Sequence, residues 1–123
     1  MPSIPLISIV DDDDALRRSL ENLIRSVGLR AQGFSSAEAF LRSNQLHETG
    51  CVILDVCMPR MSGLELKRQI AVANQHMPII FITAHEDDDL RTQALEARAV
   101  AFLYKPFYEE ELLNAIDSAL RGL

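Results

Sequence analysis

Several features that would assign the chain to other protein classes are absent from its sequence. The apolar runs fall well short of the roughly 20 residues that a membrane-spanning helix needs. An acidic cluster follows the first apolar stretch almost at once, so we expect no secretory signal and no membrane contact. We find no Gly-rich phosphate loop, no Ser, Cys or His nucleophile pair, no internal repeat and no low-complexity tract. These absences exclude the commonest nucleotide-binding and hydrolase signatures.

Cysteine and positive charge are also scarce. The two cysteines, Cys51 and Cys57, flank a predicted strand that would hold them too far apart for a relaxed disulfide. A zinc site would need further ligands beside them, so we expect reduced thiols in a cytoplasmic protein. The net charge of −6 argues against direct binding of nucleic acid by this segment.

What the chain does contain is a regular alternation of short apolar segments and amphipathic ones. Its 123 residues, 48% of them hydrophobic, suit one domain over residues 1–123. The predicted strands span 5–10, 29–34, 51–54, 78–82 and 99–104, and a predicted helix follows each. This alternation predicts an α/β fold with a parallel sheet between two helical layers. We expect the flavodoxin-like (βα)5 three-layer sandwich, with strand order 2-1-3-4-5.

Local signals mark the helix ends. Asp12 or Asp13 can cap the first helix, and Gly28 can end it in a left-handed conformation. Its apolar side chains recur at helical spacing on one face, while Arg17 and Arg18 occupy other faces. That predicted buried face consists of Leu16, Leu20, Leu23, Ile24 and Val27.

Two capping boxes and one strand glycine complete these signals. Ser35 with Glu38 predicts the start of the second helix, and Ser62 with Glu65 that of the third. Gly33 interrupts the second strand and suggests that it lies at a sheet edge. Residues 43–50 are polar and predicted to form a loop.

Polar side chains gather where the predicted strands end. Asp11 and Asp12 follow the first strand, Asp55 the third, Thr83 the fourth and Lys105 the fifth. In a parallel sheet these ends share one edge, where ligands bind. Carboxylates with water suit Mg²⁺, and a carboxylate can act as a nucleophile toward phosphorus. A lysine and a hydroxyl can neutralise the remaining phosphoryl oxygens.

These motifs, taken in order, resemble the receiver domain of two-component response regulators. The resemblance runs from Ile7 to Leu120 and looks most like the nitrogen-fixation (FixJ-type) subclass. It rests on five motifs at the predicted strand ends and loops, and no single motif is specific by itself. They are Asp11-Asp12, Leu54-Asp55, Met58-Pro59-x-Met61-x-Gly63, Thr83-Ala84 and Lys105-Pro106-Phe107.

The resemblance implies a role for each site residue. Asp55 would be the phosphoacceptor, and Thr83 and Lys105 would contact the phosphoryl group. Mg²⁺ would be bound by Asp12 directly, by Asp11 mainly through water, by Asp55 and by the backbone carbonyl of Cys57. Phe102 would be the aromatic switch residue that moves as Thr83 moves, and the Lys105-Pro106 bond would be cis.

The resemblance also implies a signalling function. A sensor histidine kinase would supply the phosphoryl group, and the face made by the fourth helix, fifth strand and fifth helix would respond. That response would control homodimerisation or an output domain. The chain would be an enzyme only in catalysing its own phosphorylation and dephosphorylation. In the FixJ-type subclass a C-terminal DNA-binding domain follows, so any DNA binding would come from such a domain.

Three positions depart from the common receiver pattern or vary within it. Arg98 stands where receivers often have glycine, and a left-handed arginine would cost on the order of 1 kcal/mol. We therefore predict a changed ending of the fourth helix. Cys57 and His85 flank the acceptor at positions that tune the phosphoryl lifetime.

Three other functions fit part of the pattern. In a haloacid-dehalogenase-type phosphotransferase or phosphatase, Asp11 would be the nucleophile and Asp13 the acid and base, but Asp55 would have no clear place. An FMN-binding flavodoxin-like domain would need its phosphate to lie against four aspartates, which repel it. An inactive receiver that only binds partners would not need the complete residue set.

Overall fold

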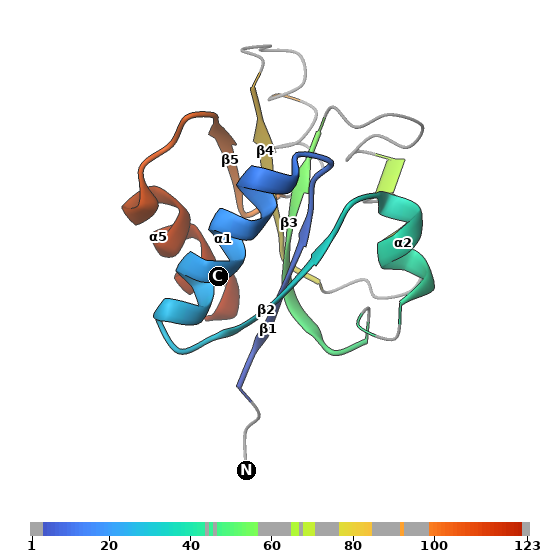
Figure 1. Ribbon diagram of the computed structural model, residues 1–123, viewed down its shortest axis with the longest axis horizontal. Coiled ribbons are helices and arrows are strands. Elements are labelled where there is room, and N and C mark those ends of the chain that lie inside the picture. The colour runs from blue at the N-terminus through green and yellow to red at the C-terminus, as the bar shows by residue number, and fades with distance from the viewer. Residues whose placement is uncertain are drawn as a thin grey trace.

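The computed structural model describes residues 4–43, 45, 47–56, 65–66, 68–70, 77–84, 92 and 99–121. Among the described residues, strands and helices alternate from β1 to β3, and β4, β5 and a last helix follow (Figure 1). The strands are β1 (Leu6–Val10), β2 (Arg30–Phe34), β3 (Thr49–Asp55), β4 (Ile79–Thr83) and β5 (Ala101–Tyr104). The helices are α1 (Asp14–Ser26), α2 (Ala37–Arg42) and α5 (Glu109–Leu120). Residues 65–66 and 68–70 are also helical.

The five strands form one parallel sheet in the order β2-β1-β3-β4-β5, which confirms the predicted topology. Val10 pairs with Leu54, Asp55 with Ile82 and Thr83 with Tyr104. The carboxyl ends of the strands therefore lie at one edge, at the top of Figure 1. β2 lies at a sheet edge, as its glycine suggested.

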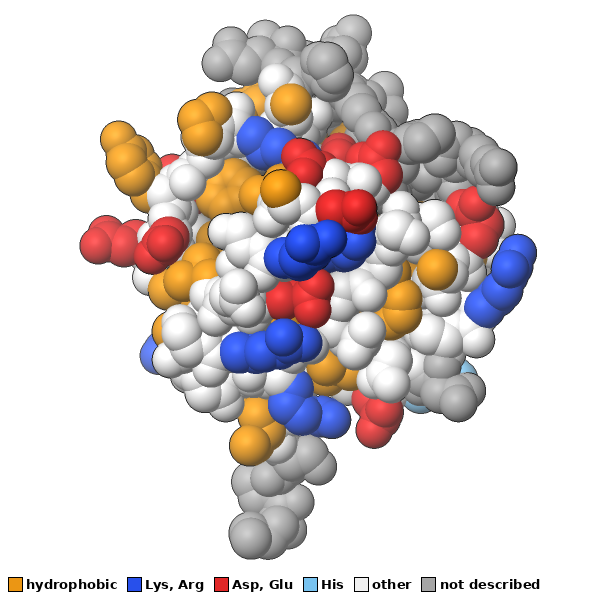
Figure 2. Space-filling model, in the orientation of Figure 1, with side chains coloured by type: hydrophobic (Ala, Val, Ile, Leu, Met, Phe, Trp, Pro, Cys, Tyr) orange, Lys and Arg blue, Asp and Glu red, His pale blue; other side chains and the backbone are white. Residues whose placement is uncertain are grey.

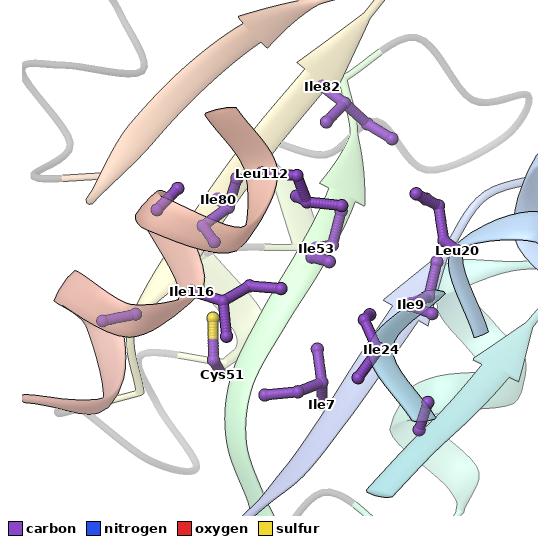
Figure 3. Close-up of a cluster of buried hydrophobic side chains, with 13 residues drawn as sticks. Ile7, Ile9, Leu20, Ile24, Cys51, Ile53, Ile80, Ile82, Leu112 and Ile116 are labelled. Atoms are coloured by element: carbon purple, nitrogen blue, oxygen red, sulfur yellow. The ribbon is translucent and has the colours of Figure 1, made fainter. Parts of the chain in front are cut away.

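Each face of the sheet is covered by helices because successive strand residues point to opposite faces. On one face Ile7, Ile9, Ile53 and Ile80 pack against α1 and α5 (Figure 3). On the other face Leu54 and Phe81 pack with Phe40 of α2 and with Leu66 and Ile70. The predicted three-layer sandwich is confirmed.

Cys51 is one of the buried side chains of the α1 and α5 layer (Figure 3). Burial raises the pKa of its thiol to about 12. A thiol with so high a pKa carries almost no thiolate at neutral pH, and Cys51 is therefore a packing residue without reactivity.

The ends of α1 follow the predicted signals with one exception. Asp13 is the N-cap, and its side chain accepts a hydrogen bond from the Leu16 amide at 3.1 Å. Gly28 has φ of 88°, the left-handed conformation expected of a glycine after a helix. Val27 was predicted to be buried but is 49% exposed. It is the C-cap, where the backbone leaves the helix and the side chain leaves the buried face.

β3 begins at Thr49, inside the segment predicted to be a loop. The Thr49 hydroxyl lies 2.6 Å from the Ser8 hydroxyl and donates to the Gln45 carbonyl at 2.6 Å. These hydrogen bonds compensate the cost of burying two polar side chains. The strand could not be recognised from hydropathy because its first residues are polar or glycine.

The second helix starts one residue later than the predicted capping box implied. Ser36, and not Ser35, is the N-cap of α2, and its hydroxyl accepts a hydrogen bond from the Ala39 amide at 3.1 Å. Glu38 is then the second helical residue, one position too early for a capping box. The proposed pairing of Ser35 with Glu38 is therefore wrong.

The Ser62 cap lies outside the described residues, as does the fourth predicted helix apart from residue 92, which is helical. In the part of the chain that the structure describes, no helix is long and apolar enough to span a membrane.

We expect replacement of Ser36 by alanine to lower the free energy of unfolding by about 1 kcal/mol, because one helical amide loses its partner. The matched change Ser35→Ala should leave stability within about 0.5 kcal/mol of wild type, as surface substitutions do. Urea unfolding followed by circular dichroism measures both. A larger loss for Ser35→Ala would contradict the assigned cap.

Candidate functional site

The turn after β1 separates the four consecutive aspartates into different roles. Asp11 is fully buried, and Asp12 is exposed. The amide of Asp11 donates to the Phe34 carbonyl at 3.1 Å, and its carboxylate accepts from the Asp13 amide at 2.9 Å. Asp13 caps α1, as described above. Asp14 pairs with Arg17, whose hydrogen bond and positive charge lower the pKa of the Asp14 carboxyl. The last two aspartates therefore start the helix.

The end of β3 brings a third carboxylate to this turn. Asp55 is buried at the last position of β3, next to β1 in the sheet. Carboxylate oxygens of Asp11, Asp12 and Asp55 lie within 4.8 Å of one another. Hard oxygen donors at this spacing fit a small divalent cation of the Mg²⁺ type better than a soft metal. The acidic cluster can therefore hold a metal ion.

Lys105 joins two of these carboxylates. Its Nζ lies 3.0 Å from Asp11 Oδ2 and 3.3 Å from Asp55 Oδ2. The Lys105 amide donates to the Thr83 carbonyl at 2.7 Å, which continues the β4 and β5 pairing and fixes the lysine backbone. The following bond to Pro106 is cis, as predicted. Figure 2 shows basic and acidic side chains together at this edge of the molecule.

The electrostatics of Lys105 follow from its two partners. Burial of the amine acts to lower its pKa, but the hydrogen bond to Asp11 and the charges of Asp11 and Asp55 outweigh burial and raise it. Lys105 is therefore charged at neutral pH. Three carboxylates and one ammonium leave a local excess of two negative charges, which is the charge that one divalent cation would balance.

Thr83 and Phe102 occupy the same face of the sheet. Thr83 is buried at the end of β4, two residues after Phe81, and Phe81 pairs with Phe102 on β5. The Phe102 ring lies 6.5 Å from that of Phe81 and 5.3 Å from that of Tyr104, measured between centroids. The structure thus places a hydroxyl at the site edge, on the same sheet face as the buried Phe81 and the partly buried Phe102 and Tyr104.

Sequence reasoning missed one contact at the site. Arg17 was assigned to an outer helix face, but its side chain is only 15% exposed. Its Nη1 donates to the Asp11 carbonyl at 2.8 Å. An arginine six residues after an aspartate is no recognisable motif, and only the fold reveals the pairing. The predicted roles of Cys57, His85 and Arg98 fall on residues outside the described ranges.

We expect the stabilisation by Lys105 to disappear at high pH. Its pKa is higher in the folded state, so its contribution is complete below the ordinary lysine pKa and is lost as pH rises through the raised value. In metal-free buffer, Lys105→Met should lower the unfolding free energy by about 1 to 3 kcal/mol at pH 7. Urea unfolding of both proteins should show this difference shrinking above about pH 10.

Arg121→Met provides the control, since it removes an exposed ion pair with Asp117 and leaves the Lys105 contacts in place. A Lys105 effect of equal size at pH 8 and pH 11 would contradict the assignment.

Comparison with known proteins places this arrangement in a family. The family model for the response regulator receiver domain matches residues 7–117. The response regulator protein TmoT of Ectopseudomonas mendocina is 49% identical over 116 residues, which cover 94% of this chain and 53% of that protein. The transcriptional regulatory protein FixJ of Azorhizobium caulinodans is 38% identical over 98% of this chain and 57% of its own length.

Solved structures agree with the sequence relatives. The response regulator StyR matches with a TM-score of 0.88 and 42% identity, covering 97% of this chain and 60% of that chain. The structure named FixJ-N matches with a TM-score of 0.86 and 34% identity over 100% of this chain and 98% of that one.

The chain spans about half the length of the curated relatives it matches. These relatives are response regulators and transcriptional regulators, and they give no support to a haloacid-dehalogenase-type enzyme. Response regulators are signalling proteins that interact with histidine kinases and often dimerise. From its sheet order, its matched residues and its relatives, we conclude that the chain belongs to the receiver domains of two-component response regulators, which are switches activated by phosphorylation.

Proposed function

We propose that Asp55 is the phosphoacceptor of this receiver and that a sensor histidine kinase is the donor. The observation that carries the proposal is the position of Lys105 Nζ, between the carboxylates of Asp11 and Asp55. The Lys105 ammonium already bridges the ends of β1 and β3. It would therefore neutralise part of the negative charge of a phosphoryl group bound there. A carboxylate oxygen of Asp55 would attack phosphorus, and the phosphorus–nitrogen bond of the phosphohistidine would break, leaving its electron pair on the imidazole.

The acidic cluster would hold Mg²⁺. Asp12 is exposed and suited to direct coordination, whereas buried Asp11 already accepts hydrogen bonds from Asp13 and Lys105 and would act mainly through water. Asp55 and the Cys57 carbonyl would complete the protein ligands. When bound, Mg²⁺ supplies charge neutralisation at the phosphoryl oxygens.

Lys105 and Thr83 would receive the phosphoryl group. After transfer the oxygen of Asp55 that faces Lys105 is close to a new dianion, and the ammonium would exchange its carboxylate contact for a phosphoryl oxygen. The Thr83 hydroxyl, at the same sheet edge, would take another. Both donors belong to strand ends at the same edge of the sheet, so each would reach the phosphoryl group by a local movement.

The switch would run through Thr83 and Phe102. Both belong to the sheet face on which Phe81, Phe102 and Tyr104 make ring contacts. A movement of Thr83 toward the phosphoryl group would leave space into which Phe102 turns. The face made by the fourth predicted helix, β5 and α5 would then change shape and expose a surface for homodimerisation or for an output partner.

Several wider roles rest on the relatives. Because matched proteins are named transcriptional regulators and extend to about twice this length, we propose that the whole protein controls transcription through a further domain. DNA would be bound by that domain and not by the receiver. We further propose a cytoplasmic location and an enzymatic activity limited to the chain's own phosphorylation and dephosphorylation.

Incubation with acetyl phosphate and Mg²⁺, followed by intact mass measurement, tests the proposal. Wild type should gain the mass of one phosphoryl group, and Asp55→Asn should gain none because an amide is a poor nucleophile. Chelation of Mg²⁺ should abolish labelling of wild type.

Asp13→Asn is the matched control, since asparagine is also a good N-cap and the changed carboxylate lies outside the cluster. It should be labelled like wild type. Equal labelling of Asp55→Asn would refute the phosphoacceptor assignment.

A further inference from the structure

We propose that Arg17 is a positioning residue that sets the direction of the Asp11 and Asp12 carboxylates before a cation binds. This inference rests on the proposed Mg²⁺-dependent function. It concerns a side chain of α1 whose described hydrogen bonds go to Asp11 and Asp14 and not to the proposed phosphoacceptor. Arg17 acts on the backbone that carries the two aspartates.

Arg17 makes two hydrogen bonds around the turn between β1 and α1. Its Nη1 donates to the Asp11 carbonyl at 2.8 Å, and its Nη2 donates to the Asp14 carboxylate. The planar guanidinium holds its donors in a fixed fork, so the two contacts lock the start of the turn to the start of the helix. A lysine has a single ammonium and cannot reproduce this geometry.

The carbonyl that Arg17 binds belongs to the peptide unit between Asp11 and Asp12. Every other polar group of Asp11 also has a partner. The amide pairs with Phe34, Oδ1 accepts from Asp13 and Oδ2 accepts from Lys105. Arg17 therefore completes a set of contacts that fixes this residue on all sides. Because the orientation of the peptide determines where the Asp12 Cα and side chain point, Arg17 also fixes the exposed metal-ligating carboxylate.

Gly33 on β2 makes room for this arrangement. A Cβ at Gly33 would lie 2.7 Å from both Cγ and Cδ of Arg17 and 2.6 Å from Glu21 Oε1. Such distances do not occur between unstrained atoms, so a side chain at this position would displace the arginine stem. Gly33 pairs with Ile9 of β1, two residues before Asp11. In the sequence, Gly33 indicated only an edge strand. In the structure, it also leaves the space through which the Arg17 side chain passes β2 to reach the turn.

Charge and position predict opposite effects of losing Arg17. As a nearby positive charge, Arg17 repels a cation, and its removal should tighten Mg²⁺ binding. As a positioning residue, its removal leaves the Asp11 carbonyl without its donor and lets the peptide rotate, which should weaken Mg²⁺ binding. The sign of the change therefore distinguishes the two roles.

The test is an NMR titration of the metal-free protein with Mg²⁺, followed through the amide signals of Asp11–Asp13. Arg17→Met should raise the dissociation constant by about tenfold, at the low end of the effect of outer-shell partners. Arg18→Met is the matched control, because it removes the same charge from the next residue, which is exposed. It should bind Mg²⁺ as tightly as wild type or slightly more tightly.

Gly33→Ala should displace the Arg17 side chain from the β2 side, and it removes no charge. It should weaken Mg²⁺ binding in the same direction, and the Arg17→Met, Gly33→Ala double variant should be no weaker than Arg17→Met alone. Urea unfolding of each variant separates stability from affinity, since a purely structural role lowers stability but leaves the dissociation constant of the folded protein unchanged. At saturating Mg²⁺, labelling of Asp55 by acetyl phosphate should recover in both single variants.

Binding by Arg17→Met that equals that of Arg18→Met would overturn the inference. An unchanged Mg²⁺ affinity of Gly33→Ala would also overturn it. This second test remains valid even if Arg17→Met does not fold. These results leave the proposed function intact, because wild type still binds Mg²⁺ and is labelled on Asp55. Failure of wild type in either measurement would instead refute the proposed function and the inference together.

Discussion

The contact of Lys105 with two carboxylates is the interaction on which the site depends. It joins the ends of β1, β3 and β5. Lys105 Nζ lies 3.0 Å from Asp11 Oδ2, 94 residues away along the chain, and 3.3 Å from Asp55 Oδ2, 50 residues away. Parallel pairing brings these ends together, and the hydrogen bond from the Lys105 amide to Thr83 holds the lysine at the level of Asp55. Without this cation, three carboxylates within 4.8 Å would repel one another.

The remaining negative charge is what makes the arrangement a binding site. A fully neutralised cluster would be a structural ion pair, whereas this one keeps an excess that a divalent cation can balance. The surroundings are rigid, because Asp11 and Asp55 are buried and Asp11 is hydrogen-bonded through its backbone and side chain. Such preorganisation reduces the cost of binding a small, strongly hydrated cation.

Sequence alone predicted the sheet order and the gathering of the site residues, because alternating elements and parallel pairing leave few other topologies. The sequence prediction was wrong where tertiary contacts override the local pattern. Thr49 belongs to β3, where its hydroxyl is hydrogen-bonded to that of Ser8. Ser36, and not Ser35, is the cap of α2, because the start of a helix is defined by backbone conformation. The contact of Arg17 with Asp11 depends on the space at Gly33 and leaves no periodic signal. The predicted site roles of Asp55, Thr83 and Phe102 remain proposals.

A crystal structure with Mg²⁺ and beryllofluoride, a stable mimic of the phosphoryl group, would test the central claim most directly. The account predicts beryllium bonded to a carboxylate oxygen of Asp55, with Mg²⁺ about 2.1 Å from oxygens of Asp12 and Asp55. Lys105 Nζ should then contact a fluoride in place of the Asp55 carboxylate. Beryllofluoride on Asp11, or Mg²⁺ bound away from the three aspartates, would contradict the account.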